Sequence, residues 1–127
     1  MIGEPLHDPT SKKVIGLAIE VHRHLGPGLL ESAYEDCLAY EFKHHEIVFR
    51  RQVALPVIYK GARLDCAYRM DFIIEDYLVL EIKAVEQLLA IHEAQLLTYL
   101  KLSHNRIGFL INFNVPLLRD GIKRMVL

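Results

Sequence analysis

The chain has no tryptophan and only two cysteines, Cys37 and Cys66, among its 127 residues. The two cysteines lack the spacing of a metal-binding pair, so they predict two reduced thiols in a cytoplasmic protein. No stretch approaches the roughly 18 apolar residues of a membrane span. The N-terminus also lacks the basic region and apolar run of a signal peptide. We therefore expect no contact with a membrane and no signal peptide.

An excess of charge of one sign is also missing. The chain carries 15 Lys and Arg against 16 Asp and Glu, a net charge of −1, which is not typical of a nucleic-acid-binding protein. This balance hides alternating blocks of net charge −4, +4, −5 and +4 over residues 1–47, 48–70, 71–100 and 101–127. The blocks could fold into an acidic pocket beside basic flanks, or they could form ordinary solvated surface.

What is present is the composition of one globular domain. The hydrophobic fraction is 52% and the charged fraction 24%, and the length suits a single domain. We assign residues 1–127 to one domain, with residues 1–10 as a loosely ordered N-terminal segment. The hydrophobic fraction is high for so small a surface, which is compatible with a homodimer or a partner subunit.

Hydrophobic periodicity predicts the elements of this domain. The predicted helices span residues 11–25, about 30–45, and from about 88 or 92 to 102. The predicted strands span residues 48–53, 55–59, 67–74, 78–83 and 106–113, with a short terminal strand at 122–126. The order α-α-β-β-β-β-α-β predicts an α/β (α+β) domain built on one mixed sheet.

Two of the apolar strands carry charges near their middles, at Asp71 and in the segment Glu81-Ile82-Lys83. A buried charge without a partner is costly, so something must compensate for these three. Because strand side chains alternate between faces, Glu81 and Lys83 point the same way. A divalent metal is an obvious partner for the two acids, and a structural ion cluster on a solvated face is the alternative.

Whether Asp71 faces Glu81 depends on the loop that joins the two strands. If this loop is the three residues 75–77, residue 74 pairs with residue 78 and Asp71 lies opposite Glu81. Opposed residues have Cβ atoms roughly 4.5–5.5 Å apart, which suits two carboxylates that share one Mg²⁺. A two-residue loop would put the acids on opposite faces. The loop has no glycine to take a left-handed conformation.

Two other groups of residues accompany this pair. Gly28-Leu-Leu-Glu31-Ser-Ala-Tyr34 begins the second helix, where Glu31 could simply offset the helix dipole and Tyr34 could pack in the core. His92, Gln95 and Tyr99 form a polar stripe on an otherwise apolar helix, where Gln95 needs a hydrogen-bond partner.

The order of these residues resembles the PD-(D/E)XK nuclease superfamily, and Gly28-x-x-Glu31-x-x-Tyr34 resembles the signature of its small GxxExxY branch. The resemblance runs from about Val14 to the C-terminus. It implies a restriction-endonuclease-like core, which is a mixed four-stranded sheet flanked by helices. It also implies that Glu31, Asp71, Glu81 and Lys83 form the site, with Gln95 as an auxiliary residue. Met70 stands where the superfamily name has proline.

From these residues and this resemblance we expect a Mg²⁺-dependent phosphodiesterase, with Mn²⁺ as a substitute, that acts on nucleic acid and on DNA in preference to RNA. Asp71, Glu81, the carbonyl of Ile82 and Glu31 would be metal ligands, and Lys83, Glu31 and Gln95 would serve catalysis. The predicted substrate contacts are Arg50, Arg51, Tyr34, Tyr99, Lys123 and Arg124. An inactive nuclease-fold binding module, a subunit of a larger DNA-processing assembly, and a metal-dependent enzyme on another substrate are the alternatives.

Overall fold

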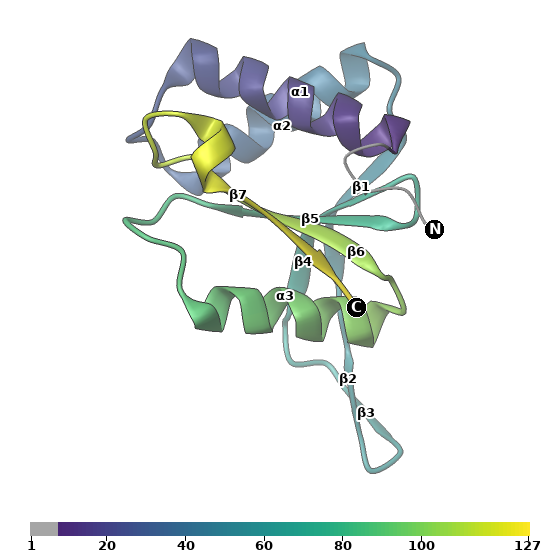
Figure 1. Cartoon of the computed structure of the whole chain (residues 1–127). Coiled ribbons are helices and arrows are strands. Elements are labelled where there is room, and N and C mark those ends of the chain that lie inside the picture. The colour runs from purple at the N-terminus through teal and green to yellow at the C-terminus, as the bar shows by residue number, and fades with distance from the viewer. Residues whose placement is uncertain (1–7) are drawn as a thin grey trace.

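The computed structural model describes residues 8–127 and shows two helical layers with a β-sheet between them (Figure 1). The helices are α1 (Pro9–Leu25), α2 (Glu31–His44), α3 (Ala90–Ser103) and the short 3₁₀ helix η2 (Leu118–Gly121). The strands are β1 (Phe49–Ala54), β2 (Val57–Tyr59), β3 (Ala62–Leu64), β4 (Arg69–Ile74), β5 (Leu78–Lys83), β6 (Ile107–Asn112) and β7 (Ile122–Val126). None of the described helices is long and apolar enough to cross a membrane.

The main sheet has five strands in the order β1-β4-β5-β6-β7. Only β5 and β6 are parallel, and α3 connects them. The predicted mixed α/β architecture is therefore confirmed, but the sheet has five strands and not the four that the resemblance implies, because the terminal strand β7 joins the sheet through β6. Residues 1–7 of the predicted loose segment lie outside the described part, and α1 begins already at Pro9.

A separate hairpin, β2–β3, extends away from the sheet (Figure 1). The sequence prediction placed its first strand in the main sheet and missed β3. A turn at Lys60-Gly61 joins Tyr59 to Ala62 in this hairpin. The partner strand Ala-Arg-Leu has no β-branched or aromatic residue, so its propensity signal is weak.

Two hydrophobic clusters hold the layers together. On one face of the sheet, residues such as Phe72, Leu80 and Phe109 pack against α1 and α2. On the other face, residues such as Val79 and Leu110 pack against Leu96, Tyr99 and Leu100 of α3. The sheet is therefore covered on both sides, which explains why β5 and β6 are almost continuously apolar.

The predicted three-residue loop between β4 and β5 is confirmed, since Ile74 pairs with Leu78. Glu75 and Asp76 both have positive φ, 52° and 60°, a conformation that glycine usually supplies. Contacts outside the loop offset this strain. The Glu75 backbone N–H donates to the Val48 carbonyl, and the Glu75 carboxylate accepts from the Val48 N–H. The Tyr77 hydroxyl donates to Asp8, the N-cap of α1.

Candidate functional site

Two of the predicted acids and one glutamine lie in one row across three strands. The pairing registers place Gln52 of β1 beside Asp71 of β4, and Asp71 beside Glu81 of β5. The regular pairing is interrupted at Asp71 on both sides. The strands therefore open around Asp71, and side chains make the hydrogen bonds that the backbone ladder would make elsewhere.

The two carboxylates bind each other's strands. The backbone N–H of Asp71 donates to Glu81 Oε2 at 2.8 Å, and the backbone N–H of Ile82 donates to Asp71 Oδ2 at 2.8 Å. These reciprocal bonds hold both acids at the opening between β4 and β5. A carboxylate offers about four lone-pair positions, so each acid keeps acceptor capacity for a further ligand.

The acids are also poorly solvated. Glu81 is only 4% exposed. Burial, followed by the charge of Asp71 and less strongly that of Glu31, raises the pKa of Glu81 to about 8. Burial, followed by the charge of Glu35, also raises the pKa of Asp71. The nearby Lys83 lowers both pKa values without reversing the shifts. The surroundings of the two acids therefore hold too little positive charge to stabilise both carboxylates, and a bound cation would supply it.

Lys83 ends β5 two residues after Glu81. Its ammonium donates to Gln95 Oε1 of α3 at 3.4 Å, so the structure brings together this predicted lysine and glutamine. Its carbonyl accepts from the Phe113 N–H at 2.9 Å. The buried Asn112, paired with Lys83 in β6, bonds both backbone polar groups of Val85 at 3.0 Å. The bond from Phe113 and the bonds between Asn112 and Val85 fix the backbone where the chain leaves the sheet after Lys83.

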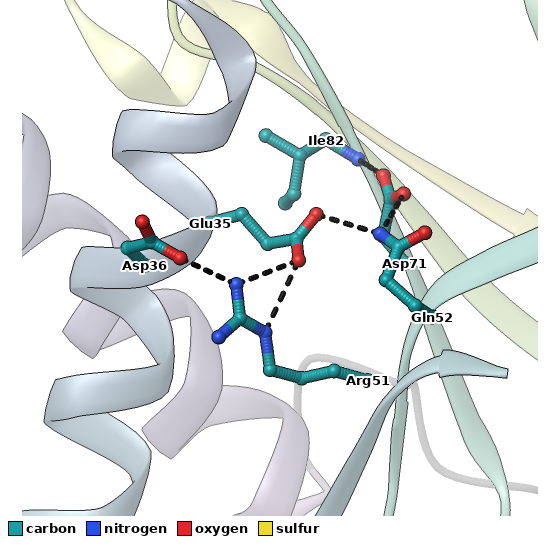
Figure 2. Close-up of polar contacts among 6 residues, drawn as sticks. All are labelled: Glu35, Asp36, Arg51, Gln52, Asp71 and Ile82. Atoms are coloured by element: carbon teal, nitrogen blue, oxygen red, sulfur yellow. Dashed lines mark hydrogen bonds and ion pairs between the residues drawn. The ribbon is translucent and has the colours of Figure 1, made fainter.

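Helix α2 faces this opening, and Figure 2 shows how its acids are connected to the sheet. Gln52 Nε2 donates to Glu35 Oε1 at 2.9 Å and to Asp71 Oδ1 at 3.2 Å. Arg51 donates to Glu35 at 2.8 and 3.1 Å and to Asp36 at 2.6 Å. The α2 acid that is connected to Asp71 is thus Glu35. The predicted Glu31, one turn earlier, is exposed and acts on Glu81 through its charge.

Two predicted substrate contacts lie in the interior instead. Tyr34 is 0% exposed, its ring stacks on Phe113 at 4.4 Å, and its hydroxyl donates to the Gly26 carbonyl and accepts from the Leu29 N–H. Its role in this structure is to hold the loop before α2. Tyr99 is 6% exposed and packs with α3 against the sheet. Burial, followed by the charge of Glu81, raises the pKa of Tyr99.

The predicted basic contacts differ in their surroundings. Arg51 is bound to two α2 acids, as described above, so it is not available to a phosphate in this arrangement. Arg50 is exposed and forms an ion pair with Asp76 at 3.2 Å. Lys123 lies 3.8 Å from Glu93, and Arg124 is exposed beside it on β7.

The donor atoms at the opening fit Mg²⁺. This hard cation prefers oxygen ligands, and it is commonly bound through one or two carboxylates while it keeps several waters. Asp71 and Glu81 supply two such carboxylates. Within residues 8–127, no group of three or more His, Cys, Asp or Glu side chains converges to hold a metal. Glu31 therefore does not complete a three-acid ligand set in this structure.

Sequence reasoning missed Glu35, Gln52 and Asn112. Glu35 lies one helical turn after Glu31, so the spacing could have included it. Gln52 and Asn112 carry no local signal, because a single amide in a strand is unremarkable until its partners are known.

The sequence over residues 8–125 matches the family model described as the PD-(D/E)XK nuclease superfamily. Since the match covers nearly the whole chain, the chain belongs to this superfamily, whose members are generally nucleases that use divalent metals. Comparisons with curated proteins and with solved structures found no match.

Proposed function

We propose that the protein is a divalent-metal-dependent nuclease of the GxxExxY branch that hydrolyses phosphodiester bonds in DNA, with Mg²⁺ as its metal and Mn²⁺ as a substitute. The observation that supports this most strongly is the pair of neighbouring carboxylates, the half-buried Asp71 and the buried Glu81, which bind each other's strands, with Lys83 two residues further along β5. In a member of this superfamily, such a pair is suited to hold a cation at a phosphate group.

Bound Mg²⁺ supplies a Lewis acid that binds a phosphate oxygen and lowers the pKa of a water molecule. Asp71, Glu81 and the carbonyl of Ile82 hold the ion in this proposal, and Glu31 holds a second ion or a water molecule. Lys83 orients the attacking water or stabilises the charge that develops on phosphorus. Gln95 restrains the Lys83 ammonium, since the two side chains are already in contact.

The acidic site needs positive charge nearby to bring a DNA backbone close to it. Arg50, Lys123 and Arg124 are exposed and serve as phosphate contacts in this proposal, which makes affinity fall steeply with salt. A single domain of this size has little room for a sequence-reading element. We therefore propose that a second copy or a partner subunit contributes to target selection.

A cleavage assay tests the enzymatic claim. Plasmid, linear and branched DNA are incubated with the purified chain in Mg²⁺ or Mn²⁺, with EDTA as the metal-free control. We expect cleavage that Lys83→Ala lowers at least a hundredfold, while Lys101→Ala, at an exposed lysine of α3, leaves it unchanged. Binding to DNA without hydrolysis would instead identify an inactive nuclease-fold module. Turnover that survives Lys83→Ala would remove Lys83 from the reaction.

A further inference from the structure

We propose that Gln52 is a positioning residue, which sets the orientation of Asp71 and connects it to Glu35 of α2. This inference deepens the proposed function and rests on it, because the metal-binding role of Asp71 belongs to that proposal. Three features of the molecule support it, namely the backbone of Gln52, its side chain and the contacts of its two partners.

The backbone of Gln52 is strained. Its φ is 49° inside strand β1, and a residue other than glycine in this region loses roughly 1–3 kcal/mol. The flanking residues Arg51 and Val53 pair normally with β4, but Gln52 does not pair with Asp71. Such strain persists only where surrounding contacts over-determine it. Here the Gln52 carbonyl accepts from Arg69, and the side chain makes the two bonds described above.

The strained residue coincides with a change of face in the neighbouring strand. Phe72 packs on the side of α1 and α2, whereas Met70 packs on the side of α3. Residues two apart in a regular strand share a face, so the alternation is reversed at Asp71. The reversal places the Asp71 side chain at the opening, where it contacts Gln52 and the N–H of Ile82.

The Gln52 amide is chemically suited to this place. Its NH₂ group has two N–H bonds, so it can serve two carboxylates at once. It binds Glu35 on one side and Asp71 on the other, as Figure 2 shows. A lysine or arginine here would also bridge the acids, but it would cancel the negative charge that attracts a cation. The neutral amide orients the carboxylate and preserves its charge.

Both oxygens of Asp71 are thereby restrained. Oδ1 accepts from Gln52 and Oδ2 accepts from the Ile82 N–H, so rotation of the carboxylate breaks at least one bond. Glu35, the other partner of Gln52, is fixed in turn by Arg51. The hydrogen bonds from Glu35 of α2 through Gln52 to Asp71 therefore fix the position of the Glu35 carboxylate relative to the Asp71 carboxylate in the sheet. Partners of this kind typically change metal affinity about 10–100-fold when they are removed.

Two substitutions at Gln52 test the role of the side-chain amide separately from the role of the positive φ. Gln52→Gly removes the amide and adopts a positive φ without strain. Gln52→Asn also tolerates a left-handed conformation, but its amide is one methylene group shorter and cannot reach both acids. Lys60→Gly is the matched control, because Lys60 in the hairpin turn has the same φ of 49° and lies outside the site.

The first measurement is amide hydrogen exchange at Ile82 in the metal-free protein, relative to Val79 and Leu80 in the same strand. If Gln52 orients Asp71, the acceptor of the Ile82 N–H becomes mobile in both variants. We expect exchange at Ile82 to become at least about tenfold faster, with no change in Lys60→Gly. Unchanged exchange at Ile82 in Gln52→Gly would overturn the inference, because this readout needs neither metal nor DNA.

The second measurement is Mn²⁺ affinity by calorimetry. We expect the two Gln52 variants to bind Mn²⁺ about tenfold or more weakly than the wild type, with no change in Lys60→Gly. Affinity equal to that of the wild type in both variants would contradict the positioning role. If the wild-type protein binds Mn²⁺ but cleaves no DNA, the proposed function fails and the positioning role stands on these affinities. If the wild type binds no Mn²⁺, the proposed function fails and Ile82 exchange alone decides the inference.

Discussion

Replacing Glu81 by glutamine should stabilise the metal-free protein at neutral and alkaline pH. Glutamine has nearly the same shape, and its Oε1 can still accept from the Asp71 N–H as the carboxylate does. The substitution removes the charge that burial and Asp71 make unfavourable. A residue proposed to bind metal is thus predicted to destabilise the fold while no metal is bound.

The size of the effect follows from the two pKa values. The pKa of Glu81 is about 8 in the folded chain and 4.5 without the environment of the fold. Between these values the folded state binds more protons than the unfolded state, so the free energy of unfolding falls as pH rises. At about 1.4 kcal/mol per pH unit, the loss is on the order of 5 kcal/mol at pH 8. Below the lower value both states are protonated and the penalty vanishes.

The assay is urea denaturation in EDTA at a series of pH values. The variant should exceed the wild type by little at pH 5 and by several kcal/mol at pH 8, whereas Glu86→Gln, at an exposed glutamate, should match the wild type throughout. Added Mn²⁺ should then stabilise the wild type, because it binds the folded state, and should have little effect on Glu81→Gln. A difference that does not grow with pH, or a less stable variant at pH 8, would refute the electrostatic argument.

The remaining predictions concern packing and hydrogen bonding elsewhere in the fold. Tyr34→Phe should lower the free energy of unfolding by about 1–3 kcal/mol in chemical denaturation, because the loop before α2 loses its bonds to the hydroxyl; an unchanged value would contradict that role. Gly121→Ala should lower the melting temperature, since the added Cβ would lie 2.2 Å from the backbone oxygen of Asn112. Gly16→Ala, on an open face of α1, should instead stabilise by up to about 1 kcal/mol, and equal shifts in the two alanine variants would contradict the steric argument.

Local patterns in the sequence were sufficient for most of the elements and for the central pair. The periodicity of residues 11–25 and the apolar run of β5 predict a helix and a buried strand because each signal lies within one segment. The register of β4 and β5 also followed locally, since the loop length determines which residues face each other. The amino-acid sequence therefore reduced the question to the loop length, and the three-residue loop of the structure places Asp71 beside Glu81.

Contacts between segments that are distant in the sequence decided the surroundings of the two acids. The alternation of side chains is reversed at Asp71, opposite a strained Gln52 that no local pattern indicates. The α2 acid that is connected to Asp71 is Glu35, because the packing of α2 brings that turn to the Gln52 amide. Tyr34 is buried because of the same packing, so of its two predicted roles the position in the core is the one that the structure shows, and not the substrate contact. The sequence by itself determined the two acids and the lysine, since they lie on neighbouring strands. Only the tertiary structure decided what surrounds them, because side chains from β1, α2 and α3 meet there through long-range packing.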